Sequence, residues 1–120
     1  MKMKFPKFEQ PEGSPKKMTK IHGLNVSDYR LSFIEKNFGI SKQQLLDMDR
    51  LEARSWIIKT TWITSFLWSR TFETTPDILI AEEHFGIDSF DKFIKLTPEE
   101  FLGKGGLLEK VYGWIKDNEY

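Results

Sequence analysis

The segment from about residue 50 to residue 72 constrains the fold of this chain more than any other part. It contains three of the four tryptophans. At 100° per residue, its apolar side chains fall on nearly all sides of a helical wheel; they are Trp56, Ile57, Ile58, Trp62, Ile63, Phe66, Leu67 and Trp68. A helix that is apolar all round has to be covered by other helices. We therefore predict a central core helix in which Trp62 is almost fully buried.

An alternative interpretation gives part of this helix a binding role. If one side stays open, Trp56 or Trp68 would offer a partner protein the kind of aromatic anchor that dominates binding energy at interfaces. We predict that these two residues are the partner-binding residues of the body of the protein. The core and binding interpretations can both hold at different residues.

Start and stop signals for helices divide the chain from residue 27 onward. Ser27 can cap a helix that Gly39 ends, and Ser41 with Gln44 forms a capping box for the next helix. Further starts are indicated at Asp49–Glu52, at Thr75-Pro76, at Thr97-Pro98 and after the break Gly103–Gly106. No segment reads convincingly as a strand. We predict an all-α fold, a compact domain of five or six helices (residues 25–120) around the Trp-rich helix.

Residues 1–24 differ in composition from the rest of the chain. They hold six lysines against two glutamates, and three of the five prolines, with no helical or alternating period. This pattern favours an extended basic arm that becomes ordered only against another surface. Either the arm is loose or folded back on its own domain, or it docks on a neighbouring subunit or a phosphate backbone. The docking residues would be Phe5, Phe8, Lys16, Lys17 and Lys20, with both phenylalanines in one hydrophobic groove.

Two short stretches resemble each other. Residues 35–41 and 82–88 both contain Phe-Gly-Ile followed by a polar residue, Ser41 in the first copy and Asp88 in the second. The pattern predicts a left-handed glycine that ends one helix and a polar residue that caps the next. It fits a true repeat or, as we favour, a helix-hairpin solution that recurs without shared ancestry.

Residues 30–48 can also be read as a DNA-binding helix-turn-helix motif. Apolar residues flank the turn at Gly39, and the second helix would present Lys42, Gln43 and Gln44 to a groove. The same region also carries Asp47 and Asp49, whose charges would repel the phosphates of DNA. We keep a sequence-specific DNA-binding regulator as the alternative hypothesis. The formal net charge of zero favours weak, non-specific nucleic-acid binding at most.

Residues that could carry catalysis or bind a metal are scarce. The chain has no cysteine and only two histidines, so we predict neither an enzyme nor a metal or cofactor site. The longest uncharged run lies between Lys59 and Arg70. It is far shorter than the ~18 apolar residues of a spanning helix, so we expect no membrane segment and a cytoplasmic location.

Residues 80–87 (Ile-Ala-Glu-Glu-His-Phe-Gly-Ile) and 96–101 (Leu-Thr-Pro-Glu-Glu-Phe) resemble helical segments in small tail-assembly and accessory proteins of tailed bacteriophages. Phe38-Gly39-Ile40 with Leu45, Leu46, Met48 and Trp56 is similar in the same way. The resemblance covers about half of the chain. It implies a phage-encoded, non-enzymatic protein that works by contact with other proteins, and it transfers no catalytic residue.

These observations together predict a non-catalytic protein-binding module. It would act in virion assembly or by blocking a host or defence protein, so it would be found in the host cytoplasm or in the virion. Its partner would be another viral or host protein, or a second copy of the chain.

Overall fold

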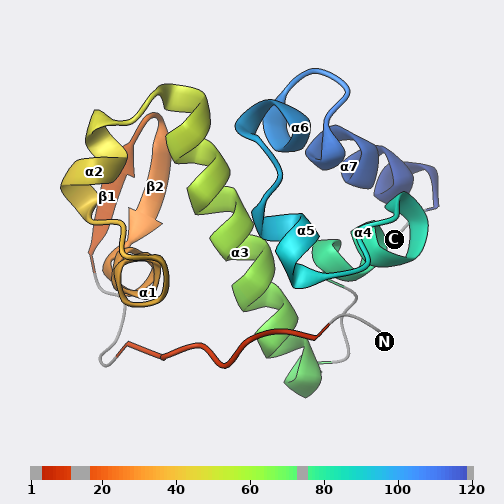
Figure 1. Cartoon of the computed structure of the whole chain (residues 1–120), viewed down its shortest axis with the longest axis horizontal. Helices are drawn as coiled ribbons and strands as arrows, with labels where there is room; N and C mark the ends of the chain where they lie inside the picture. Colours follow the sequence, from red (N-terminus) through yellow and green to blue (C-terminus); the bar gives the residue numbers. More distant parts are fainter. Residues whose placement is uncertain (1–3, 12–16, 73–75, 119–120) are drawn as a thin grey trace. The chain divides into compact units, whose positions relative to one another are not determined.

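The computed structural model describes residues 4–11, 17–72 and 76–118, without the side chains of 68–72. The described chain is mostly helical, as predicted, and also contains a small two-stranded sheet (Figure 1). Its elements are β1 (Met18–Ile21), β2 (Leu24–Ser27), α1 (Asp28–Phe38), α2 (Lys42–Asp47), α3 (Arg50–Phe72), α4 (Asp77–Phe85), α5 (Phe90–Ile94), α6 (Pro98–Leu102) and α7 (Leu107–Asp117).

Contacts divide the chain into two compact units, and α3 contributes to both. One unit is Pro6–Thr60, and the other combines Met1–Phe5 with Thr61–Tyr120. The first part of α3 belongs to one unit and its second part to the other. No helix among the described residues is long and apolar enough to cross a membrane.

The hairpin β1–β2 corrects the prediction of a chain without strands, and β1 lies within the predicted arm. Its antiparallel register pairs Thr19 with Val26 and Ile21 with Leu24. His22 and Gly23 both have positive φ, as in the two-residue type I′ turn that suits hairpins. Each strand has four residues, too few for alternation to stand out in the sequence. Burial of Ile21 and Val26 against helices therefore decides the pairing.

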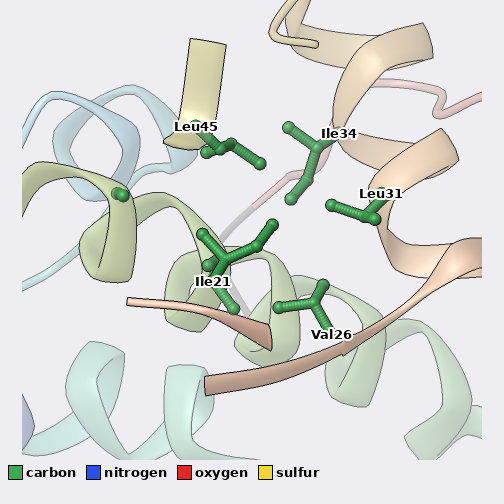
Figure 2. Close-up of a cluster of buried hydrophobic side chains, with 7 residues drawn as sticks. Ile21, Val26, Leu31, Ile34 and Leu45 are labelled. Atoms are coloured by element: carbon green, nitrogen blue, oxygen red, sulfur yellow. The ribbon is translucent and has the colours of Figure 1, made fainter. Parts of the chain in front are cut away.

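A cluster of buried aliphatic side chains forms the core of the Pro6–Thr60 unit. Figure 2 shows Ile21 and Val26 of the hairpin pointing toward Leu31 and Ile34 of α1, with Leu45 of α2 closing the cluster. Four of these five side chains are at most 1% exposed. The hairpin thus serves as one wall of the core, and α1 and α2 serve as the others.

Aromatic rings dominate the core of the unit that contains Thr61–Tyr120. Trp62 is 1% exposed, as predicted. Its ring stacks on Phe93 of α5 at 5.8 Å and meets the edge of Phe101 of α6 at 4.9 Å between centroids. Helix α7 packs against α4 and α6. This second part of α3 is therefore covered by aromatic side chains from the helices that come after it in the chain.

Most of the predicted helix ends are confirmed. Ser27 caps α1, and both capping boxes form, one from Ser41 with Gln44 and one from Thr97 with Glu100. Pro76 departs from the prediction, because it is the N-cap of α4 and not its first helical residue. Thr75, its predicted capping partner, lies outside the described residues.

The two Phe-Gly-Ile stretches share a turn but differ in the residue that caps the next helix. Gly39 and Gly86 both end a helix with φ near 70°. Ser41 caps α2 as predicted, whereas α5 is capped by Ser89, one residue after the predicted Asp88. The shift rotates the second helix by one position, so Phe93 is buried there and Lys92 is exposed.

Alanine substitutions at three glycines are expected to change stability in opposite directions. Gly39→Ala and Gly86→Ala should each cost about 1–2 kcal/mol, because a Cβ disfavours their left-handed backbone although nothing lies within 4 Å of it. Gly113 lies inside α7, and again nothing lies within 4 Å of an added Cβ. Gly113→Ala should therefore stabilise the protein by about 0.5–1 kcal/mol. Urea unfolding followed by circular dichroism measures both signs. Equal shifts at all three positions would contradict the conformational explanation.

Candidate functional site

One face of α1 holds residues 8–11 of the arm, which we call the docked segment. Tyr29, Phe33 and Asn37 are spaced by four residues and therefore lie on one stripe of the helix, which we call the α1 stripe. Each of the three contacts the docked segment. All of these residues belong to the Pro6–Thr60 unit.

Asn37 binds the backbone of the docked segment at both of its polar groups. The Glu9 N–H donates to Asn37 Oδ1 at 2.8 Å, and Asn37 Nδ2 donates to the Glu9 carbonyl at 3.0 Å. The same Nδ2 donates to the Phe33 carbonyl at 3.0 Å, which orients the amide. A side-chain amide here imitates the pairing of a neighbouring strand. This contact therefore recognises an extended backbone regardless of the side chain at position 9.

Phe8 supplies the apolar contact of the docked segment. Its ring centroid lies 5.5 Å from that of Phe33, which is fully buried, and 6.1 Å from that of Phe38. Phe38 in turn lies 5.3 Å from Trp56. A connected row of aromatic rings thus runs from the docked segment through α1 to α3. Aromatic pairs at such separations contribute about 0.5–1.5 kcal/mol beyond the area they bury.

At the C-terminal end of the docked segment, one residue is hydrogen-bonded to α1 and the next is buried. The Tyr29 hydroxyl donates to the side-chain carbonyl oxygen of Gln10, and Pro11 is buried. The side chains of Glu9 and Gln10 are otherwise exposed. The α1 stripe therefore contacts the segment at three points, which are the ring of Phe8, the peptide unit of Glu9 and the side chain of Gln10.

The predicted arm residues are found in different surroundings. The ring centroid of Phe5 lies 4.1 Å from that of Phe66 and 5.4 Å from that of Phe90. Phe8 contacts α1 instead, so within this chain the two rings do not share one groove. Lys17 and Lys20 are exposed. Lys16 lies outside the described residues. The arm thus folds back on its own chain, and its contact with a partner stays a prediction.

The predicted binding residues of the body lie on α3. Trp56 is half-buried between the ring of Phe38 and the Lys59 ammonium, whose Nζ lies 5.7 Å from the indole centroid. A cation over an indole face is attracted by the ring quadrupole. The Trp68 side chain lies outside the described part of the chain. Trp56 is therefore partly covered by its own unit.

The residues of the predicted DNA-binding motif are placed by the same unit. Ile34 and Leu45 are fully buried on the two sides of the Gly39 turn, as that motif requires. Lys42, Gln43 and Gln44 are all exposed. Gln43 Nε2 donates to Asp47 at 3.0 Å, and Gln44 Oε1 accepts from the Ser41 N–H at 2.7 Å. Both glutamines are therefore engaged within their own helix.

A separate group of titratable residues comes from α4 and α7. Burial raises the pKa of Asp77. Burial also raises the pKa of Tyr112, the charge of Asp77 raises it further, and Trp62 lowers it. Such shifts occur at structural as well as functional sites. No group of three His, Cys, Asp or Glu residues in the described chain could hold a metal ion.

An open hollow of about 410 Å³ lies among α4, α6 and α7. Its lining combines four apolar residues with four charged ones, which are Phe85, Ile87, Leu96 and Leu107, and Glu99, Glu100, Lys104 and Lys110. Two of the charged residues are acidic and two are basic. The hollow therefore gives no preference for the charge of a ligand.

Sequence reasoning identified Phe8 but missed the residues that hold it. Tyr29, Phe33 and Asn37 lie in the helix predicted between Ser27 and Gly39, and none of the three was predicted as a binding residue. One signal could have been used. Asn37 is a polar residue four positions after Phe33, so both lie on one side of the predicted helix and could face an extended arm. No family model matches the chain, and neither the curated proteins nor the solved structures contain a match.

Proposed function

We propose that this protein is a non-catalytic protein-binding module that holds an extended, aromatic-bearing segment on the α1 stripe. The observation that carries the proposal is the double hydrogen bond between Asn37 and the backbone of Glu9. In keeping with the resemblance to phage tail-assembly proteins, we place its action in virion assembly or in blocking a host or defence protein.

The three contact points divide the work of recognition. Hydrogen bonds to a peptide unit give affinity for any extended segment, whereas pockets for individual side chains give specificity. In the docked segment these side chains are Phe8, against Phe33, and the buried Pro11. We expect the aromatic residue of a ligand to pack on Phe33, and a proline three positions later to take the buried place of Pro11.

Helix α3 supports this face in the proposal. Its Trp56 packs against Phe38 behind the docked segment, and Ala53 and Ile57 join the core that holds α1. We infer that the Trp-rich helix is the central element of the fold, and that its role is to keep α1 rigid.

A displayed library of random peptides tests the proposed function. The bait is the full chain with Phe8→Ala, which removes the ring contacts of the arm and so lets a peptide compete with it for the stripe. We expect selected peptides to carry an aromatic residue followed three positions later by proline. Adding Asn37→Ala should reduce their retention at least tenfold, whereas adding Asn25→Ala, at an exposed asparagine of the hairpin, should leave it unchanged. Equal retention on both double variants would contradict the proposal.

The alternative function is a DNA-binding regulator that uses residues 30–48. The buried Ile34 and Leu45 across Gly39 favour it, and the engaged side chains of Gln43 and Gln44 speak against it. Salt-resistant binding to one specific duplex, lost in Gln43→Ala or Gln44→Ala, would promote this alternative. Binding that falls steeply with salt and ignores base sequence is expected instead.

A further inference from the structure

We propose that the α1 stripe also binds the docked segment of a second copy of this chain, so that two copies join by arm exchange. This inference rests on the proposed function and names a partner for the same site. The occupant is set by the segment that already lies on the stripe, because residues 8–11 of this chain fit it at every contact point.

The contacts between the docked segment and α1 can also form between two copies. The hydrogen bonds of Glu9 and Gln10 and two ring contacts of Phe8 are made with α1, through Tyr29, Phe33, Asn37 and Phe38. In sequence the segment is separated from α1 by residues 12–16 and the hairpin. A second copy offers the same segment, so each of these bonds broken within one copy forms again between two.

Concentration decides between the two arrangements. A segment tethered by a short linker competes at an effective concentration of the order of millimolar. In dilute solution each arm therefore stays on its own copy, and exchange begins where copies are crowded together, as in an assembling particle. Pro6 and Pro11 restrict the released arm, which lowers the entropy lost when it docks again.

Two complementary variants of the full chain isolate the exchange. The donor carries Asn37→Ala and Tyr29→Phe, which remove the bonds to Glu9 and Gln10 and so weaken the hold of its own stripe on its own arm. The receiver carries Phe8→Ala and Glu9→Pro, which remove the ring and the N–H that bind the stripe. Sedimentation velocity at about 10–100 μM should show each variant alone as a monomer. This concentration is enough for the mixture, because no intact tethered arm competes for the stripe of the receiver. Their mixture should form a one-to-one dimer.

The controls separate exchange from other association. A control donor carries only Asn25→Ala, so its stripe is intact and keeps its own arm bound. Its mixture with the receiver should stay monomeric. A peptide of residues 4–11 should dissociate the donor–receiver dimer. The same labelled peptide should bind the receiver at least tenfold more tightly than it binds the unchanged chain, where the tethered arm competes. Far-UV circular dichroism checks that the variants keep their helices.

Two results would overturn the exchange. One is a donor–receiver mixture that stays monomeric, and the other is a labelled peptide that binds the receiver no more tightly than the unchanged chain. If the library selection still succeeds, the stripe serves a different protein and the proposed function stands. If the selection also fails, the proposed function falls with the exchange.

Discussion

Trp62→Ala is expected to lower the free energy of unfolding by about 3–5 kcal/mol, the usual range for removing a large buried aromatic side chain. Trp62 is 1% exposed and contacts the rings of Phe93 and Phe101. Its removal leaves these two rings without their shared neighbour. Urea unfolding followed by far-UV circular dichroism is the appropriate measurement, because it does not depend on the tryptophan that is removed.

Trp114→Ala is the matched control for this change. Trp114 lies in the same unit, is only half-buried and stacks on His84 at 4.3 Å between centroids. Its loss should cost about 1 kcal/mol, since partly exposed side chains contribute less. A urea midpoint that Trp62→Ala leaves unchanged would show that this part of α3 is not a core element.

Two neighbouring leucines of α2 provide the second large effect. Leu45 is fully buried in the cluster of Figure 2, whereas Leu46 is 38% exposed. Leu45→Ala should therefore lower the free energy of unfolding by about 2–5 kcal/mol. Leu46→Ala should change it by no more than about 0.5 kcal/mol. Both substitutions replace leucine by alanine in the same helix, so they change helix propensity equally. The difference between their effects on the free energy of unfolding therefore measures burial.

The outcome also bears on the packing of α1 against α2. Leu45 and Ile34 meet across the Gly39 turn and form part of the core behind the docked segment. If both leucine variants unfold at the same urea concentration, α2 does not pack as the structure places it. Thermal unfolding at two protein concentrations serves as a check, because self-association would make the midpoint depend on concentration.

The candidate site could be predicted from the sequence only in part. The arm stood out because its prolines, lysines and lack of period differ from the rest of the chain, and Phe8 is one of its few large apolar groups. Which surface Phe8 meets could not be found this way. Residues 8 and 33 are brought together by the fold, and no local pattern encodes a contact over such a separation.

Local chemistry in the sequence determined where helices begin and end. Ser27, Ser41 and Thr97 cap helices because their side-chain oxygens accept from free amides of the first turn, and Gly39 and Gly86 tolerate a left-handed backbone. The burial of Trp62 followed from an apolar helix that has to be covered. These features depend on neighbours in the chain or on hydrophobicity alone.

Tertiary structure decided the features that need a distant partner. Two four-residue strands pair because Ile21 and Val26 find a core formed by α1, α2 and the start of α3. Ser89 caps α5 in place of Asp88. As a result Phe93 is the buried residue of that helix, whereas the turn pattern alone would have buried Lys92. Asn37 becomes a binding residue only because the arm crosses α1 beside it. In each case the energy comes from burial or from a hydrogen bond between residues far apart in sequence, which no local pattern can specify.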